Sequence, residues 1–198
     1  MPTKNIHISK ESERASNGVN TAVAAQKKSF DALKGEMGYE NVMQVPKVTK
    51  LVVSSGVGKV NKDKKRLELV ESRLARITGQ KAAPREAKRA IANFKSRIGD
   101  IIGYQVTLRG ARRDAFLSKL INIVLPRVKD FRGIKPSAID EMGNITIGIK
   151  EHTVFPETSD EDAKDVFGLA ITIATTAKNK KEAEAFLRHI GLPLQEAK

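Results

Sequence analysis

The stretch LAITIAT, residues 169–175, alternates large aliphatic side chains with small or polar ones. The stretch NITIGI, residues 144–149, shows the same alternation. Successive side chains of a β-strand point to opposite faces of its sheet, so this period of two predicts two strands that are each buried on one face. Strands of this kind are typical of antiparallel sheets, in which the other face can stay open. The two stretches therefore predict a mainly antiparallel sheet with one free face.

A helical pattern earlier in the chain predicts part of the layer that covers this sheet. Apolar residues recur at helical spacing between residues 64 and 77, and the dipeptide Thr78-Gly79 then ends the pattern. These apolar residues are Leu67, Val70, Leu74 and Ile77. The other side of the helix is expected to carry its cations: Lys64, Lys65, Arg66, Arg73 and Arg76.

Shorter patterns supply the remaining elements. Helices are expected over residues 19–37 and 114–125, and strands over residues 48–57 and 101–109. Residues 80–99 fit either a short strand or a short helix, followed by a mobile loop around residues 96–99.

The last helix has clear end signals. Asn179 is its expected N-cap, Glu182 stands three residues later as in a capping box, and Gly191 follows its end. Together these elements predict an α+β fold, a mainly antiparallel sheet with helices packed on one face. We expect a single domain over residues 19–198, preceded by a flexible N-terminal extension over residues 1–18.

Positive charge is concentrated in the first two thirds of the chain. Residues 1–135 contain 29 Lys and Arg against 12 Asp and Glu, a net charge of +17. Residues 136–198 contain 7 against 11, a net charge of −4. A basic block of this length indicates a surface for a polyanion, and nucleic acid is the first candidate because binding to phosphates releases condensed counterions. The alternative is a soluble protein with a high pI.

The composition excludes several classes of protein. The chain has 198 residues, 40% of them hydrophobic, which fits one globular domain. It has no Cys, which excludes a disulfide framework, a thiolate metal site and a Cys nucleophile. No apolar run reaches the roughly 18–20 residues of a membrane span, and the N-terminus lacks the hydrophobic core of a secretory signal. We therefore expect a cytoplasmic protein.

The sequence contains no catalytic or cofactor-binding constellation. The segment Gly56-Val57-Gly58-Lys59 follows a predicted strand, but Val53 stands where a phosphate loop needs its first Gly and Val60 where it needs Ser or Thr. The acidic cluster over residues 157–165 lacks the ligand order and central Gly of a calcium loop. The three histidines have no metal-ligand spacing: His7, His152 and His189. These observations predict a protein that is not an enzyme and that needs no metal or cofactor.

One basic segment has the chemistry of an RNA-binding loop. Lys88, Arg89, Lys95 and Arg97 stand close to Phe94 and to two glycines. A flexible basic loop with an aromatic side chain can follow a phosphate backbone and stack on an exposed base. Because only 5% of the residues are aromatic and none is Trp, contacts to phosphates and to RNA shape should dominate over stacking.

Seven short motifs connect the chain to a known family. In order they are NVMQVPK (41–47), GVG (56–58), TGQ (78–80), VTLRG (106–110), LPRVKDFRG (125–133), GN (143–144) and FPE (155–157). Together they resemble the bacterial-type large-subunit ribosomal protein five family over about residues 20–194. The resemblance implies an α+β fold and a structural protein of the large ribosomal subunit. Such a protein binds 5S rRNA and helps to anchor it in the central protuberance.

The resemblance also implies a set of rRNA-binding residues, because family members contact 5S rRNA largely through the exposed sheet and its edges. The matching polar residues are Gln80 and Thr107, whose side chains can hydrogen-bond to a base edge or a 2′-hydroxyl. A third family contact is usually an Asn, and Ser54, with its shorter reach, stands at that position. Lys88, Arg89 and Arg109 complete the expected set.

A second set of residues is implied for tRNA. The segment from Ala92 to Gly103 matches the mobile loop that reaches toward the tRNA in the ribosomal P site in this family. The residues expected to contact tRNA are Asn93, Phe94, Lys95, Ser96 and Arg97. The expected partners are thus 5S rRNA, adjacent 23S rRNA, neighbouring large-subunit proteins and P-site tRNA.

Two alternatives stay open from the sequence. The same basic surface could serve a module that binds some other RNA or DNA. An RNA-acting enzyme would need a catalytic pair or a metal cluster, and the sequence shows neither.

Overall fold

A five-stranded sheet with strand order β2–β3–β1–β5–β4 forms the centre of the computed structural model, which describes residues 26, 29–35, 37–58, 63–94, 96–158 and 165–195. Every neighbouring pair of strands is antiparallel. The strands are β1 (Val48–Gly56), β2 (Ala83–Glu86), β3 (Ile101–Leu108), β4 (Ile145–Ile149) and β5 (Leu169–Thr175). The antiparallel sheet predicted from the alternating stretches is confirmed, and the strand expected over residues 169–175 has those bounds.

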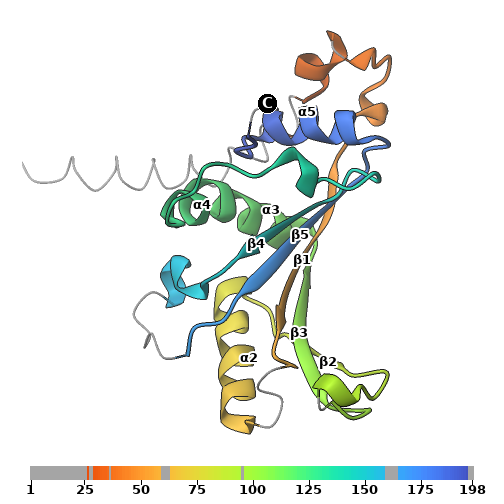
Figure 1. Ribbon diagram of the computed structural model, residues 1–198. Helices are drawn as coiled ribbons and strands as arrows, with labels where there is room; N and C mark the ends of the chain where they lie inside the picture. Colours follow the sequence, from red (N-terminus) through yellow and green to blue (C-terminus); the bar gives the residue numbers. More distant parts are fainter. Residues whose placement is uncertain are drawn as a thin grey trace, which may run out of the picture.

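Helices cover one face of the sheet (Figure 1). The longer ones are α2 (Lys64–Thr78), α3 (Gly110–Lys119) and α5 (Lys180–Ile190), and residues 29–35 are also helical. A π-helical turn η4 (Leu120–Val124) and the short α4 (Leu125–Arg127) continue α3. The 3-10 turns are η1 (Val42–Gln44), η3 (Ala92–Phe94), η5 (Pro136–Ala138), η6 (His152–Val154) and η7 (Pro156–Thr158). The predicted α+β class, with helices on one face, is confirmed.

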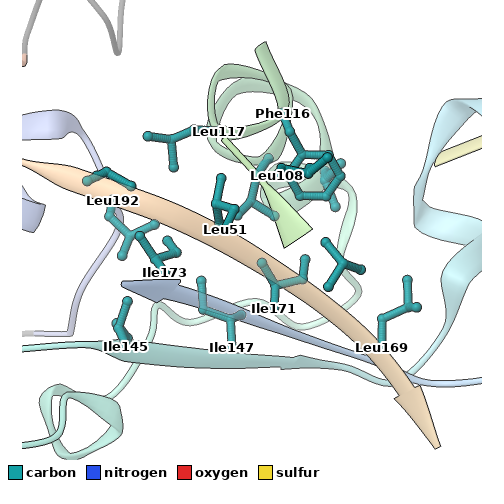
Figure 2. Packing of buried hydrophobic residues seen from close by; sticks show 14 of the residues in the cluster. Leu51, Leu108, Phe116, Leu117, Ile145, Ile147, Leu169, Ile171, Ile173 and Leu192 are labelled. Atoms are coloured by element: carbon teal, nitrogen blue, oxygen red, sulfur yellow. The ribbon is translucent and has the colours of Figure 1, made fainter. Parts of the chain in front are cut away.

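The core lies between the helices and the inner face of the sheet. Figure 2 shows Leu51, Leu108 and Ile171 pointing from the strands toward Phe116 and Leu117 of α3. All three strand residues are fully buried, at 0% exposure. Because the sheet buries large side chains on this face alone, the opposite face is left to smaller ones.

The helix α2 matches its predicted span, but one of its cations was placed wrongly. Arg73 is buried among the core residues rather than solvated with the other cations. Its position lies three residues after Val70 and four before Ile77, on the buried side of the helix. Its Nη1 donates to the Asp165 carbonyl at 2.9 Å and lies 3.1 Å from His152 Nε2, so the buried charge has polar partners.

The capping of α5 also differs from the prediction. Asn179 is the N-cap and Gly191 ends the helix with a φ of 96°, as predicted, but the Asn179 side chain makes no capping hydrogen bond. Glu182 accepts hydrogen bonds from the Tyr39 hydroxyl at 2.6 Å and from the Lys178 backbone N–H at 2.7 Å. The carboxylate is therefore occupied by a long-range contact rather than by a capping box, and the Tyr39 pKa is raised by burial and by this carboxylate.

Two further expectations concern the ends of the chain and membranes. The predicted extension over residues 1–18 lies outside the described residues. In the part of the chain that the structure describes, no helix is long and apolar enough to cross a membrane.

Candidate nucleic-acid interface

The central rows of the open face of the sheet carry no charge. The strand registers place Thr146, Thr172, Val52 and Thr107 side by side in one row across β4, β5, β1 and β3. A second row contains Gly148, Ala170, Ser54 and Gln105. Small side chains in both rows would let a partner approach the sheet closely over a wide area.

Hydroxyl groups lie on this surface in fixed positions. The Oγ1 atoms of Thr146 and Thr172 are 3.0 Å apart, within hydrogen-bond distance across β4 and β5. The Ser54 hydroxyl reaches only to the Ala170 carbonyl of the neighbouring strand, at 3.5 Å. Ser54 is therefore on the open face, as expected for a contact residue, but its side chain stays close to the sheet.

The loop that follows α2 brings Gln80 against β3. Gly79 ends the helix in the left-handed conformation, with a φ of 67°, and the buried Thr78 hydroxyl donates to the Leu74 carbonyl at 2.7 Å. Gln80 Nε2 then donates to the Thr107 carbonyl at 3.4 Å. The two residues expected to read RNA, 27 positions apart in the sequence, are thus neighbours in the structure.

Lys119 of α3 contacts the C-terminal end of α2. Its Nζ donates to the Ile77 carbonyl at 2.7 Å and pairs with Glu157 at 2.6 Å. It also lies 5.3 Å from the ring centroid of Phe116 and 5.9 Å from that of Phe155. The backbone leading into Gln80 is therefore fixed by a partly buried ion pair.

Two arginines at the start of α3 stand beside this contact. Arg109 is the N-cap residue of α3 and is exposed. Arg112, one turn into the helix, donates from Nη1 to Gln80 Oε1 at 3.4 Å. We call Gln80, Thr107 and Arg112 the Gln80 corner. Arg112 was missed from the sequence because the helix was expected to begin at residue 114, whereas it begins at Gly110. The available signal was its position three residues after Arg109, in the first turn of α3.

The remaining predicted residues lie in the hairpin between β2 and β3. Lys88, Arg89, Asn93 and Arg97 are exposed there, and Ser96 closes the hairpin through a bridge with Ile91. Lys95 and the side chain of Phe94 lie outside the described residues. The predicted loop over residues 92–103 was too long, because residues 101–103 pair within β3.

The predicted rRNA-binding residues therefore form separate groups. The hairpin lies at the start of β3 and Thr107 near its end, about 20 Å apart at about 3.3 Å per residue (Figure 1). Ser54 lies between them, opposite Gln105. Arg85 of β2 donates to Gln105 Oε1 at 2.6 Å and so connects the sheet edge to its open face.

Acidic residues line the other side of the Gln80 corner. A groove there is formed by Glu68, Glu71, Ser72, Ala75, Gly79, Gln80 and Lys81. Burial raises the pKa of the Tyr104 hydroxyl, and the charges of Glu71 and Glu68 raise it further. Lys81 Nζ lies 3.6 Å from Glu71 Oε1 and offsets part of this charge, so the groove is less favourable to a polyanion than the cationic start of α3.

Comparison with known proteins assigns the chain to a family. Residues 41–97 match the family described as ribosomal protein L5, and residues 101–194 match the model for the C-terminus of the same ribosomal family. The chain belongs to the ribosomal protein L5 family. A similar protein is the large ribosomal subunit protein uL5 of Natranaerobius thermophilus, 49% identical over 81% of this chain and 90% of the relative. The uL5 proteins of Ureaplasma urealyticum and a Synechococcus strain are 47% and 46% identical over 84% and 83% of this chain, and over 90% and 92% of their own length.

Membership of the L5 family confirms several predictions at once. The resemblance drawn from the seven motifs is confirmed, as is a structural rather than enzymatic role. The uL5 relatives are large ribosomal subunit proteins, which agrees with the expected location in the large subunit. In the described residues, no group of three or more His, Asp or Glu side chains is arranged to hold a metal ion.

Proposed function

We propose that this L5 family protein binds 5S rRNA through the open face of its sheet and helps to anchor it in the central protuberance of the large subunit. The hairpin between β2 and β3 reaches toward P-site tRNA. Adjacent 23S rRNA and neighbouring large-subunit proteins complete its surroundings. The observation that carries this proposal is an open sheet face with uncharged, hydroxyl-bearing central rows and with cations at both ends of β3.

The chemistry of this face suits RNA. An A-form helix presents a wide, shallow minor groove with 2′-hydroxyls and base edges. The small residues Gly148, Ala170 and Ser54 allow such a surface to come close, while Thr107 and Gln80 offer groups that both donate and accept hydrogen bonds. The cations at the two ends, Lys88 and Arg89 at one and Arg109 at the other, would bind phosphates and fix the register.

The hairpin suits a contact that extends beyond the sheet. Ile98 is 72% exposed in a turn of the hairpin's second arm, beside the exposed Arg97, whose backbone N–H donates to Asp100 at 2.8 Å. An apolar side chain beside a basic one can pack against a sugar or a base while the cation contacts the RNA backbone.

A salt titration of 5S rRNA binding in a filter assay tests the proposal. Retention should fall as salt rises, with log K decreasing by roughly 0.7–0.9 per phosphate contact for each unit of log salt. Unrelated RNA of equal length, added as competitor, separates 5S rRNA recognition from general RNA binding. A protein that retains no 5S rRNA at moderate salt, or retains both RNAs equally, would contradict the proposal.

A further inference from the structure

We propose that Arg112 has two roles at the Gln80 corner, and the inference rests on the proposed function. It holds the Gln80 amide in one orientation, and its free N–H groups bind an RNA phosphate next to the group that Gln80 reads. The same guanidinium would therefore bind a phosphate and orient the Gln80 amide that hydrogen-bonds to the neighbouring nucleotide.

The orientation of the Gln80 amide follows from its two partners. The Thr107 carbonyl can only accept a hydrogen bond, so the Gln80 atom 3.4 Å away must be the amide nitrogen. A guanidinium can only donate, so the Gln80 atom 3.4 Å from Arg112 must be the carbonyl oxygen. The two contacts agree on one orientation. One N–H and one lone pair of the amide remain for a ligand, in known positions.

Arg112 has exposed donors to spare, whereas its neighbour Arg113 is engaged within the fold. Arg113 is internal: it donates to the Val48 carbonyl and pairs with Asp114 at 2.6 Å. Arg112 is exposed, and in the described part of the chain the Gln80 carbonyl is its one acceptor. A guanidinium has five N–H donors in a planar fork that matches phosphate oxygens. The remaining donors of Arg112 are therefore available to a phosphate without breaking the contact to Gln80.

The surrounding charges favour this assignment. The groove on the α2 side of Gln80 carries Glu68 and Glu71 with only Lys81 to offset them, whereas the start of α3 carries the exposed cations Arg109 and Arg112. The path to Gln80 that favours an RNA strand therefore runs past the start of α3. Arg112 stands on that path, one turn after the exposed Arg109. A phosphate held by Arg112 would place its own ribose or base next to the free edge of the Gln80 amide.

Filter binding to 5S rRNA over a salt series tests the phosphate contact. Arg112→Ala should weaken binding by about tenfold and reduce the salt slope by about one phosphate contact. Arg112→Lys should keep most of the slope but lose part of the affinity, because an ammonium lacks the fork. Lys181→Ala is the matched control, since it removes one exposed positive charge from α5. If Arg112→Ala behaves like Lys181→Ala, the inference is wrong.

The coupling to Gln80 has two tests of its own. In a double-mutant cycle, the combined loss for Arg112→Ala with Gln80→Ala should be smaller than the product of the two single losses. Without RNA, the side-chain amide signals of Gln80 in an NMR spectrum should shift in Arg112→Ala and stay unchanged in Lys181→Ala. Multiplicative losses together with an unshifted Gln80 signal would overturn the orienting role.

Failure of the proposed function would be seen separately. Wild-type protein that does not retain 5S rRNA would contradict 5S binding whatever the variants do. The same salt series on 23S rRNA would then decide the inference. Equal slopes for the wild type and Arg112→Ala on that RNA would overturn the phosphate contact, and a lower slope for the variant would support it.

Discussion

The two faces of the sheet are built from the same strands but differ in the size and the exposure of their side chains. On β1 and β5, Leu51, Val53, Ile171 and Ile173 are fully buried at 0% exposure. The residues between them on the open face include Val52, Ser54, Ala170 and Thr172, which are small or medium in size and partly exposed. One face therefore carries stability and the other is free to carry binding. Substitutions on neighbouring residues of one strand should separate the two.

The largest effect is expected on the buried face. Ile171→Ala should lower the free energy of unfolding by about 2–5 kcal/mol, because it removes buried methyl groups from a packed core and leaves a cavity. Thr172→Ala, on the open face of the same strand, should cost less than about 1 kcal/mol for its hydroxyl contact with Thr146. Urea denaturation of the two variants measures both values. Similar losses for the two would mean that the open face also carries stability.

The next effect concerns binding rather than stability. Gln80→Ala and Thr107→Ala should each weaken 5S rRNA binding by about 1–3 kcal/mol if these residues read RNA, by analogy with direct readout of bases. The fold should tolerate both changes, since the contact between Gln80 and β3 uses the Thr107 carbonyl and not its hydroxyl. Filter binding gives the affinity, and thermal melting gives the control. Unchanged affinity would remove the residue concerned from the site.

The contrast between the faces was largely predictable from the sequence. A period of two is a local property, and both late strands showed it clearly enough to predict the antiparallel sheet and its open face. Gln80 and Thr107 were named as RNA-binding residues from family motifs, but their proximity was not predicted, because the contact joins the end of a helix to a strand at the other side of a hairpin. Periodicity does not record such a long-range contact.

The errors have the same origin in long-range contacts. Arg73 was assigned to solvent by its charge, but His152 and the Asp165 carbonyl, both far along the chain, give it buried partners. Glu182 was assigned to a capping box with Asn179, but one of its carboxylate oxygens accepts a hydrogen bond from Tyr39, 143 positions away. Arg112 was missed because the helix was expected to begin at residue 114, and the Gln80 side chain that it contacts stands 32 positions earlier in the sequence. In each case the residue is held by a group that is distant in the sequence and becomes its neighbour only in the folded chain.

The role of the small side chains on the open face can be tested by adding a larger one. A Cβ at Gly148 would meet nothing within 4 Å, so Gly148→Val should fold normally and is expected to gain slightly from the β-propensity of Val. If RNA lies on this part of the sheet, the added side chain should weaken binding by about fivefold, or about 1 kcal/mol. Filter binding and thermal melting of the variant measure the two effects. Full affinity with a normal melt would place Gly148 outside the RNA footprint.

The smallest effect is expected at Ser54, the position at which the family resemblance implies an Asn. The Ser54 hydroxyl makes only a 3.5 Å contact to the Ala170 carbonyl, so Ser54→Ala should change neither stability nor RNA affinity by more than about 0.5 kcal/mol. Ser54→Asn adds reach and a second donor on the open face, next to the small Ala170, and should tighten 5S rRNA binding by up to about threefold. A titration that compares the wild type with both variants measures the difference. If Ser54→Asn binds more weakly than Ser54→Ala, this part of the face accepts RNA only because its side chains are short, and the hydrogen bonds must come from the Gln80 corner alone.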